Sequence, residues 1–296
     1  MKRTTFLLII TIIFLSQSCT KSEPKIVDDR VQVFTSILPQ KFLVDRIGGD
    51  FVNTQSIVGS GDSPATYQPT PNQIMALSQA DILFKIDVPY EEVFLKKITA
   101  TLKNLKIIDT SAGINKRHID SHNHDGDKST HSEAESLDPH VWLSPVLAKV
   151  QAKTILNSLI SLDPNNKEYY KTRYDKLILD LDNITFELHA KLAPLKGKTM
   201  FVYHPSFGYF TDEFGLNQEA IESGGKEPTP AQLEEIISEA ITDGVRIIIV
   251  QPEFSIKSAK AIASAINGTV TTMNPLEVNY IENLRKMGNT IVTAYK

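Results

Sequence analysis

Histidines gather in one short polar stretch of this sequence. Five of the seven lie between residues 118 and 140, in a run that mixes them with carboxylates and contains almost nothing apolar. Imidazole is the commonest nitrogen ligand for zinc and similar divalent metals. Because such a polar run cannot pack a core, we interpret the cluster first as a metal-handling segment.

The last histidine of the cluster differs from the other four. His140 closes the segment Asp138-Pro139-His140 and is followed by the apolar run 141–143, which would hold it still. The other four lie in the polar run itself: His118, His122, His124 and His131. For these four the alternative is a solvated loop without a specific role, since a His-rich composition does not by itself establish binding.

Length and composition fit a soluble globular protein with two lobes. The 296 residues can bury a large core, and the 41% hydrophobic and 22% charged residues are ordinary values. The formal net charge of −4 argues against nucleic-acid binding, because that function selects basic patches.

The N-terminus is expected to lie outside the fold. Lys2 and Arg3 precede the apolar run 6–15, which is too short to span a bilayer. A short positive region followed by such a run is typical of a secretory signal. We therefore predict that residues 1–18 are a signal peptide.

Cys19 follows this segment directly and is the sole cysteine, so it cannot form a disulfide within the chain. Its position resembles a bacterial lipoprotein cleavage site, where the cysteine becomes the lipidated first residue. Ser16 and Gln17 depart from that pattern, in which an aliphatic and then a small residue are usual. We expect lipidation of Cys19 and a polar tether over 19–30; a free exported protein is the alternative.

Strand-like and helix-like segments alternate in the first part of the chain. Thr70-Pro71 is a good helix start, with a capping hydroxyl and proline at the first helical position. The alternation predicts a parallel sheet with right-handed crossovers. The predicted strands are 31–37, 51–58, 81–86 and 105–108, and the predicted helices are 42–47, one from Thr70-Pro71, and 91–99.

A long helix is predicted after Asp163-Pro164. Apolar or aromatic residues recur every three or four positions from 170 to 192, with no glycine or proline before Pro194. Nearly thirty helical residues would span roughly 43 Å at about 1.5 Å per residue. We interpret this helix as a rigid strut between two lobes.

The second part of the chain resumes the alternation, with strands at 198–203, 245–250 and 269–273 and helices at 205–214, 230–242 and 258–266. The predicted fold class is α/β, with two lobes that each contain a parallel sheet, joined by one long rigid helix. Ligands of such sheets bind beyond the carboxyl ends of the strands, so the ligand cleft is expected between the lobes. The predicted divisions are an N-terminal lobe at 31–162 with a His-rich loop at 115–137, a linking helix at 163–194 and a C-terminal lobe at 195–296. The segments expected to border the cleft are 59–68, 138–142, 203–209, 251–254 and 273–276.

Several motifs recur in an order and spacing typical of one family. The chain resembles the solute-binding proteins of zinc and manganese ABC transporters, especially the high-affinity zinc-uptake type, from about residue 31 to residue 296. The acidic, His-rich run ahead of D-P-H is also typical of the zinc members. The motifs are T-Y-Q-P-T-P at 66–71, D-P-H-V-W-L-S-P at 138–145, Tyr169-Tyr170 after Asp163-Pro164, Y-H-P-S-F-G-Y-F at 203–210, E-P-T-P-A-Q-L at 227–233, Q-P-E-F-S at 251–255 and M-N-P-L at 273–276.

The resemblance implies a metal held by one ligand from each of four segments, commonly three histidines and a carboxylate. His140 and His204 match two of these positions. The other two depart from the pattern: Ala65 stands where the family has histidine, and Asn274 stands where it has aspartate. Alanine offers no donor atom and asparagine only a neutral amide oxygen, so affinity should fall below the family norm.

Three explanations for the missing ligands remain open. The His-rich loop could supply a histidine, or the cleft could take a metal complex that brings its own donors. Alternatively, other residues of the cleft could complete the shell. The candidate carboxylates are Asp62, Glu222, Glu227 and Glu253, and the weaker candidate donors are Tyr67 and Gln68.

We expect a lipid-anchored extracytoplasmic protein, acting as a monomer, that captures a divalent cation for the permease of an ABC importer. Zinc is favoured and manganese is the alternative, because the ligands are nitrogens and manganese prefers oxygen. Capture should weaken as pH falls through about 6.5, the unperturbed histidine value, because metal binding needs neutral imidazoles.

Two other functions compete with this hypothesis. One is a surface metal buffer or adhesin in which the His-rich loop is the working part. The other is a metal-dependent hydrolase, for which Ser206 near His204 would be the nucleophile, but the chain has no H-E-x-x-H, G-x-S-x-G or nucleotide-binding loop. His189, on the long helix, is expected to be a solvated helix residue.

Overall fold

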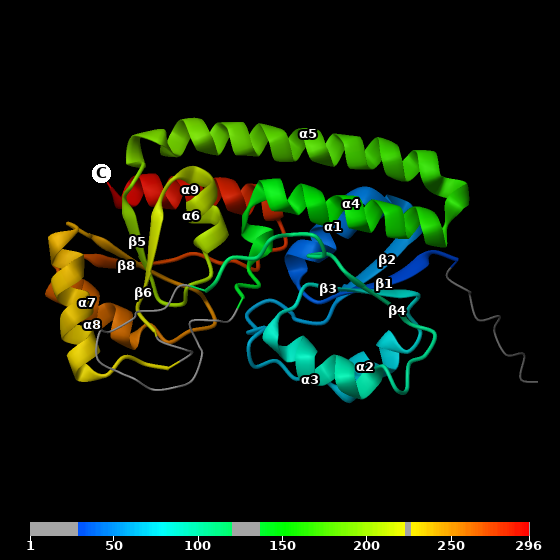
Figure 1. Ribbon diagram of the computed structural model, residues 1–296, viewed down its shortest axis with the longest axis horizontal. Coiled ribbons are helices and arrows are strands. Elements are labelled where there is room, and N and C mark those ends of the chain that lie inside the picture. Colours follow the sequence, from blue (N-terminus) through cyan, green and yellow to red (C-terminus); the bar gives the residue numbers. More distant parts are fainter. Residues whose placement is uncertain (1–28, 120–136, 223–225, 296) are drawn as a thin grey trace, which may run out of the picture.

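The computed structural model describes residues 29–119, 137–222 and 226–295. The predictions for the signal peptide, for Cys19 and for His122, His124 and His131 therefore lie outside the described residues. The described chain forms two α/β lobes side by side, covered along one edge by long helices (Figure 1).

The first lobe is built on a four-stranded parallel sheet in the order β2-β1-β3-β4. Its central strands are buried, as expected of a parallel sheet covered on both faces. The elements are β1 (Val31–Thr35), α1 (Leu38–Gly48), β2 (Val52–Ser56), α2 (Pro71–Leu77), β3 (Ile82–Lys85), α3 (Pro89–Ile98) and β4 (Lys106–Asp109).

The second lobe repeats this plan, with a four-stranded parallel sheet in the order β6-β5-β7-β8. The predicted fold class is confirmed: there are two parallel α/β sheets and a long joining helix. The elements are β5 (Thr199–Val202), α6 (Gly208–Phe214), β6 (Asn217–Ala220), α7 (Pro230–Thr242), β7 (Ile247–Val250), α8 (Lys257–Ala265) and β8 (Thr269–Thr272).

Two helices that follow a Thr-Pro pair begin in the same way. The Thr70 hydroxyl accepts the backbone N–H of Gln73, while the Gln73 side chain accepts the backbone N–H of Thr70. Thr229 and Gln232 form the same reciprocal pair at the start of α7. Each of these reciprocal pairs is a capping box. It satisfies backbone N–H donors that the first helical turn leaves free, and so fixes where α2 and α7 start.

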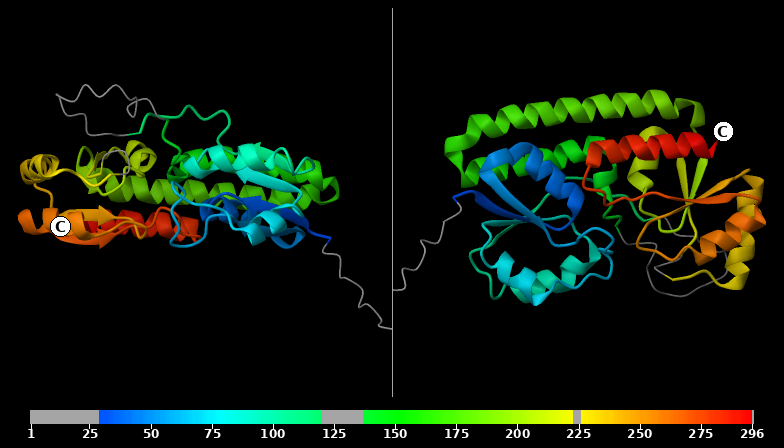
Figure 2. Two further views of the ribbon diagram at one scale, coloured as in Figure 1. Left: turned by 90° about the horizontal axis from the view of Figure 1, so that it is seen from below. Right: turned by 180° about the vertical axis from the view of Figure 1, so that it is seen from behind.

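The long helix α5 (Lys167–Leu192) runs along both lobes. Its 26 residues are flanked by single 3-10 turns at Pro164–Asn166 and Ala193–Leu195, so the α-helix itself is shorter than predicted. It packs against α1 of the first lobe, α4 (Pro145–Leu162) and α9 (Tyr280–Ala294), and Figure 2 shows α9 beside it from behind. The buried face is Tyr170, Leu177, Leu181, Ile184, Leu188 and Leu192.

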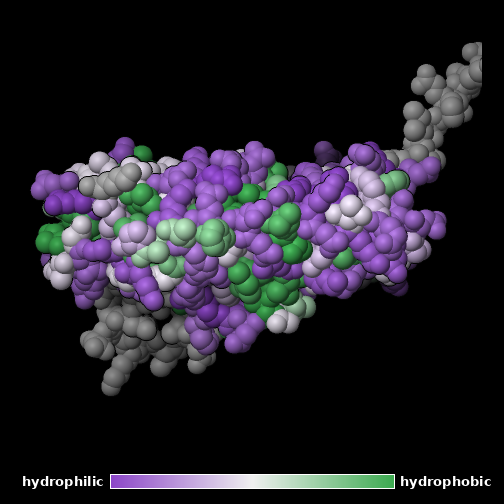
Figure 3. All heavy atoms as spheres, turned by 90° about the horizontal axis from the view of Figure 1, so that it is seen from above, coloured by the Kyte–Doolittle hydropathy of each residue, from purple (hydrophilic) through white to green (hydrophobic). Residues whose placement is uncertain are grey.

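One apolar core continues from the first lobe, through the buried face of α5, into one side of the second sheet. A second cluster fills the other side of that sheet beneath α7 and α8. The outer face of the molecule seen over α5 is mostly hydrophilic, with separate hydrophobic patches (Figure 3). Among the described residues, no helix has the length and apolar character needed to cross a membrane.

Candidate metal-binding site

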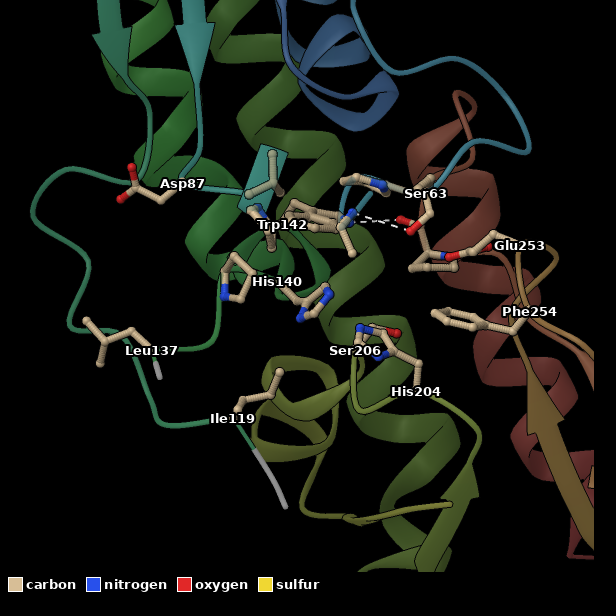
Figure 4. Close-up of a pocket in the computed structure, with 17 residues that line it drawn as sticks. Ser63, Asp87, Ile119, Leu137, His140, Trp142, His204, Ser206, Glu253 and Phe254 are labelled. Carbon is tan, nitrogen blue, oxygen red and sulfur yellow. Dashed lines mark hydrogen bonds between the residues drawn. The ribbon is translucent and has the colours of Figure 1, made fainter. Parts of the chain in front are cut away.

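A cavity of about 220 Å³ lies between segments of the two lobes (Figure 4). Each of the five segments expected to border the cleft contributes to its lining. Four of them follow β2, β5, β7 and β8, and residues 87–89 after β3 also take part. The cavity therefore lies where parallel α/β sheets ordinarily bind ligands, beyond the carboxyl ends of their strands.

His140 and His204 meet in this cavity. His140 comes from the connection between β4 and α4, and His204 follows β5 in the second lobe. Their ring centroids are 5.3 Å apart, and the close-up shows both imidazoles pointing toward the centre of the cavity (Figure 4). The side chains are 11% and 19% exposed, so an ion from solvent can reach them.

Each imidazole is oriented by a buried carboxylate. His140 Nδ1 lies 2.7 Å from Asp138 Oδ1, and His204 Nδ1 lies 2.6 Å from Glu222 Oε1. An ionised carboxylate only accepts hydrogen bonds, so both Nδ1 atoms carry the proton and both Nε2 atoms keep a lone pair. Metal-ligating histidines usually have this partner, which fixes the tautomer and raises ligand basicity.

Neighbouring side chains hold His204 in place. Gln251 Nε2 donates to the His204 carbonyl at 2.6 Å and to Ser206 Oγ at 2.8 Å, while Gln251 Oε1 accepts the His204 N–H at 3.3 Å. The Phe254 ring stacks on the imidazole with centroids 5.1 Å apart. The Ser206 hydroxyl thus accepts a hydrogen bond from Gln251, and among the described residues no base bonds to it.

The segment that carries His140 is tied to the second lobe. Trp142 Nε1 donates to the Pro275 carbonyl at 2.8 Å, and the Tyr280 hydroxyl donates to the Trp142 carbonyl. The Tyr209 hydroxyl on α6 donates to the Asp138 carbonyl at 2.9 Å and accepts the Arg117 N–H at 3.0 Å. These bonds fix the position of His140 relative to the second lobe, which carries His204.

The two positions at which the sequence departs from the expected ligand pattern are placed differently in the structure. Ala65 borders the cavity but brings no donor atom. Asn274 does not border it, and its Oδ1 accepts the Leu276 N–H at 2.9 Å. With the amide oxygen used in this way, the other end of the side chain is an NH₂ donor, which a cation does not favour.

Most of the side chains proposed to complete the shell are occupied elsewhere. Glu222 supports His204, Glu227 accepts from Ser258, and the Tyr67 hydroxyl donates to Gln73 Oε1. Asp62 and Gln68 do not border the cavity. Of these candidate donors, Glu253 borders the cavity in the part of the chain that the structure describes.

Two carboxylates of the described chain border the cavity, and their surroundings differ. Burial disfavours ionisation of Asp87, but hydrogen bonds from Lys116 and Lys85 outweigh it and lower its pKa. Burial raises the pKa of Glu253, and this shift is opposed by its own backbone N–H and by attraction to His204. The charge of Asp87 is thus neutralised by lysines, whereas Glu253 forms no ion pair with a lysine or arginine of the described residues.

The described residues contain no ready-made group of three or more His, Cys, Asp or Glu side chains placed to hold a metal. His118 is exposed and pairs with Leu137 in an isolated β-bridge. His189 is half exposed, its Nε2 lies 3.1 Å from Glu213 Oε1, and its ring contacts Phe214. Among the described residues, the cavity therefore offers two oriented imidazoles and one carboxylate, Glu253, that is not paired with a lysine.

Two parallel α/β lobes, a long joining helix and an interlobe cavity with facing imidazoles define a metal-binding solute-binding protein. The chain belongs to the family described as periplasmic zinc-uptake complex component A, whose sequence model matches residues 33–294. The predicted family is confirmed. Proteins of this family are transport components and not enzymes, which excludes the hydrolase alternative.

Named relatives agree with this assignment. The chain is 28% identical over 265 residues to the high-affinity zinc uptake system protein ZnuA of Bacillus subtilis (strain 168), covering 88% of this chain and 83% of that protein. A crystal structure of ZnuA superposes with a TM-score of 0.83 at 34% identity, covering 90% of this chain and 100% of the other. A ZnuA deletion mutant with zinc bound gives a TM-score of 0.82 at 33% identity, covering 90% and 98%.

Proposed function

We propose that this protein captures one zinc ion in the interlobe cavity, with His140 and His204 as ligands. The observation that carries the proposal is the pairing of each Nδ1 with a buried carboxylate, which leaves two Nε2 lone pairs facing one cavity. Asn274, the weak third donor expected from the sequence, is a poorer choice because its oxygen is already bonded to Leu276 N–H.

Zinc is favoured over manganese because both oriented ligands are nitrogens. The zinc-bound structure of the related ZnuA mutant supports the same choice. Two neutral imidazoles leave the charge of the ion uncompensated, so a third donor from the cavity or from solvent must complete the shell.

The remaining parts of the proposal concern the partners. A captured ion would pass to the permease of an ABC transporter, with which a zinc-uptake component works. Cys19 would carry a lipid that holds the protein, as a monomer, at the outer face of a membrane. His118, His122, His124 and His131 would collect metal without forming the high-affinity site.

Calorimetric titration of the lipid-free mature chain with zinc and with manganese tests the proposal. We expect one tight zinc ion, weaker manganese, and loss of the tight site in His140→Ala and in His204→Ala. His189→Ala is the matched control, because that histidine lies outside the cavity, and it should bind like the parent.

A second variant separates the cavity from the His-rich segment. Replacing His118, His122, His124 and His131 together by alanine should leave the tight site intact. If that variant loses the tight zinc while His140→Ala keeps it, the segment is the working part, and the metal-buffer or adhesin alternative replaces the proposal.

A further inference from the structure

We propose that Glu253 is a third, anionic ligand of the captured metal and replaces the carboxylate that is missing at Asn274. The inference rests on the proposed site at His140 and His204. Glu253 lies on the loop that follows β7, whereas Asn274 lies on the loop that follows β8.

Glu253 is the available negative charge in the cavity. It lines the same cavity as both histidines, and the other lining carboxylate of the described chain, Asp87, is paired with Lys85 and Lys116. No lysine or arginine in the described residues forms an ion pair with Glu253, and its carboxylate accepts a hydrogen bond from its own backbone N–H. A divalent cation could therefore bind the Glu253 carboxylate without first breaking an ion pair with a lysine or arginine of the described residues.

The position of Glu253 relative to His204 is fixed from both sides. Two residues before it, Gln251 bonds the backbone N–H and carbonyl of His204. One residue after it, Phe254 stacks on the imidazole, and the Phe254 N–H closes the turn onto the Gln251 carbonyl at 3.2 Å. The loop that carries Glu253 must accordingly follow His204 in any small movement of the second lobe.

The carboxylate reaches the metal by side-chain rotation. The described residues hold no preformed three-ligand group, so Glu253 must turn toward the two Nε2 atoms when the ion enters. Glutamate has three rotatable bonds, and this one gives up a single hydrogen bond to its own backbone. Two nitrogens, one carboxylate oxygen and one water would then give the four donors that zinc prefers.

The test uses the mature chain in which His118, His122, His124 and His131 are alanine, so that zinc reports on the cavity. We expect Glu253→Gln, which keeps the size of the side chain, to weaken zinc binding by about 10- to 100-fold or more. Losses of that size follow removal of a residue that merely supports a ligand, so removing a ligand should cost no less. Asp62→Asn is the matched control, because it removes the same charge from an exposed residue outside the cavity, and it should bind like its parent.

A zinc-soaked crystal of the parent gives an independent readout. An anomalous peak should lie on His140 and His204 with a Glu253 carboxylate oxygen about 2.0–2.2 Å away. Zinc on both histidines with Glu253 turned away, or an unchanged dissociation constant in Glu253→Gln, would overturn this inference and leave the proposed function standing. Absence of zinc from the cavity of the parent would overturn both.

Discussion

At the scale of single residues, the two carboxylates behind the imidazoles set how the rings are oriented in the cavity. Asp138 and Glu222 are buried, and each holds one histidine with Nε2 free. Their effect is indirect, since they set the tautomer, the ring orientation and the basicity of the ligands.

Removing Glu222 should therefore weaken binding without touching a ligand. We expect zinc affinity in Glu222→Ala to fall by about 10- to 100-fold. Glu222→Gln keeps an oxygen that can accept the Nδ1 proton, so its loss should be smaller. Competition titration against a zinc chelator measures both; equal losses in the two variants would show that the ring orientation does not depend on this bond.

Another buried carboxylate, that of Glu91, makes stability depend on pH. Its oxygens accept the backbone N–H groups of Ile86 at 3.0 Å and Asp87 at 2.8 Å, in the loop that borders the cavity. Burial raises the pKa of Glu91 from the ordinary 4.5 to about 7, against the hydrogen bonds from the Ile86 and Asp87 N–H groups, which lower it. The folded chain thus holds this proton to higher pH than the unfolded chain does.

The sign follows from that order of pKa values. The stabilisation that comes from protonated Glu91 is fully present below about pH 4.5 and is lost as the pH rises through about 7. From pH 5 to pH 8 we expect the free energy of unfolding to fall by about 2–3 kcal/mol more in the parent than in Glu91→Gln. Urea unfolding at several pH values measures this difference, and parallel curves for the two proteins would contradict it.

The residue scale also shows what sequence could and could not predict. The pairing of His140 with His204 was predictable from D-P-H and Y-H-P-S, which match known family motifs. The partner Glu222 could not be assigned its role, because it lies 18 positions from His204. The two meet because β5 and β6 are adjacent parallel strands, so the residues just beyond their ends lie side by side.

At the scale of elements, the buried stripe of α5 holds the lobes together. Leu181 is fully buried in the core that continues through both lobes, whereas Leu179, two residues away, is 60% exposed. Leu181→Ala should lower the free energy of unfolding by about 2–5 kcal/mol, because it removes packed methyl groups and leaves a cavity. Leu179→Ala should change it by less than about 0.5 kcal/mol. Urea unfolding of the two variants, compared with the parent, checks the contrast.

The elements that sequence analysis omitted fall into two kinds. No element was predicted over α4 or α9, although the Ser144 hydroxyl accepts the Leu147 N–H at the start of α4 and the buried residues of this helix recur every three or four positions. The start of α4 and its periodicity could therefore have been read from the sequence. Similar signals predicted the Thr-Pro start and the bounds of α7 correctly. β6 is different: its sequence Asn-Gln-Glu-Ala has no strand propensity, and it forms at the edge of a sheet because β5 offers it a partner.

At the scale of the whole molecule, a bound ion would join the two lobes directly. His140 comes from one lobe and His204 from the other, so an ion held by both would bind the folded arrangement and not the unfolded chain. At a free zinc concentration of 100 times the dissociation constant, stability should rise by about 2.7 kcal/mol. Thermal unfolding with and without zinc should show a rise in Tm in the parent that His204→Ala lacks; an equal rise in both would place the stabilising ion elsewhere.

The bonds of Tyr209 have a consequence for how this protein can change. One hydroxyl on α6 holds both Arg117 and Asp138, and the Asp138 N–H donates to the Arg117 carbonyl at 2.8 Å, so the chain leaves and returns at a single point. The two anchor residues, Arg117 and Asp138, are therefore held together two residues before His140. We therefore expect that changing the number of residues between these two anchors leaves the position of His140 unaltered.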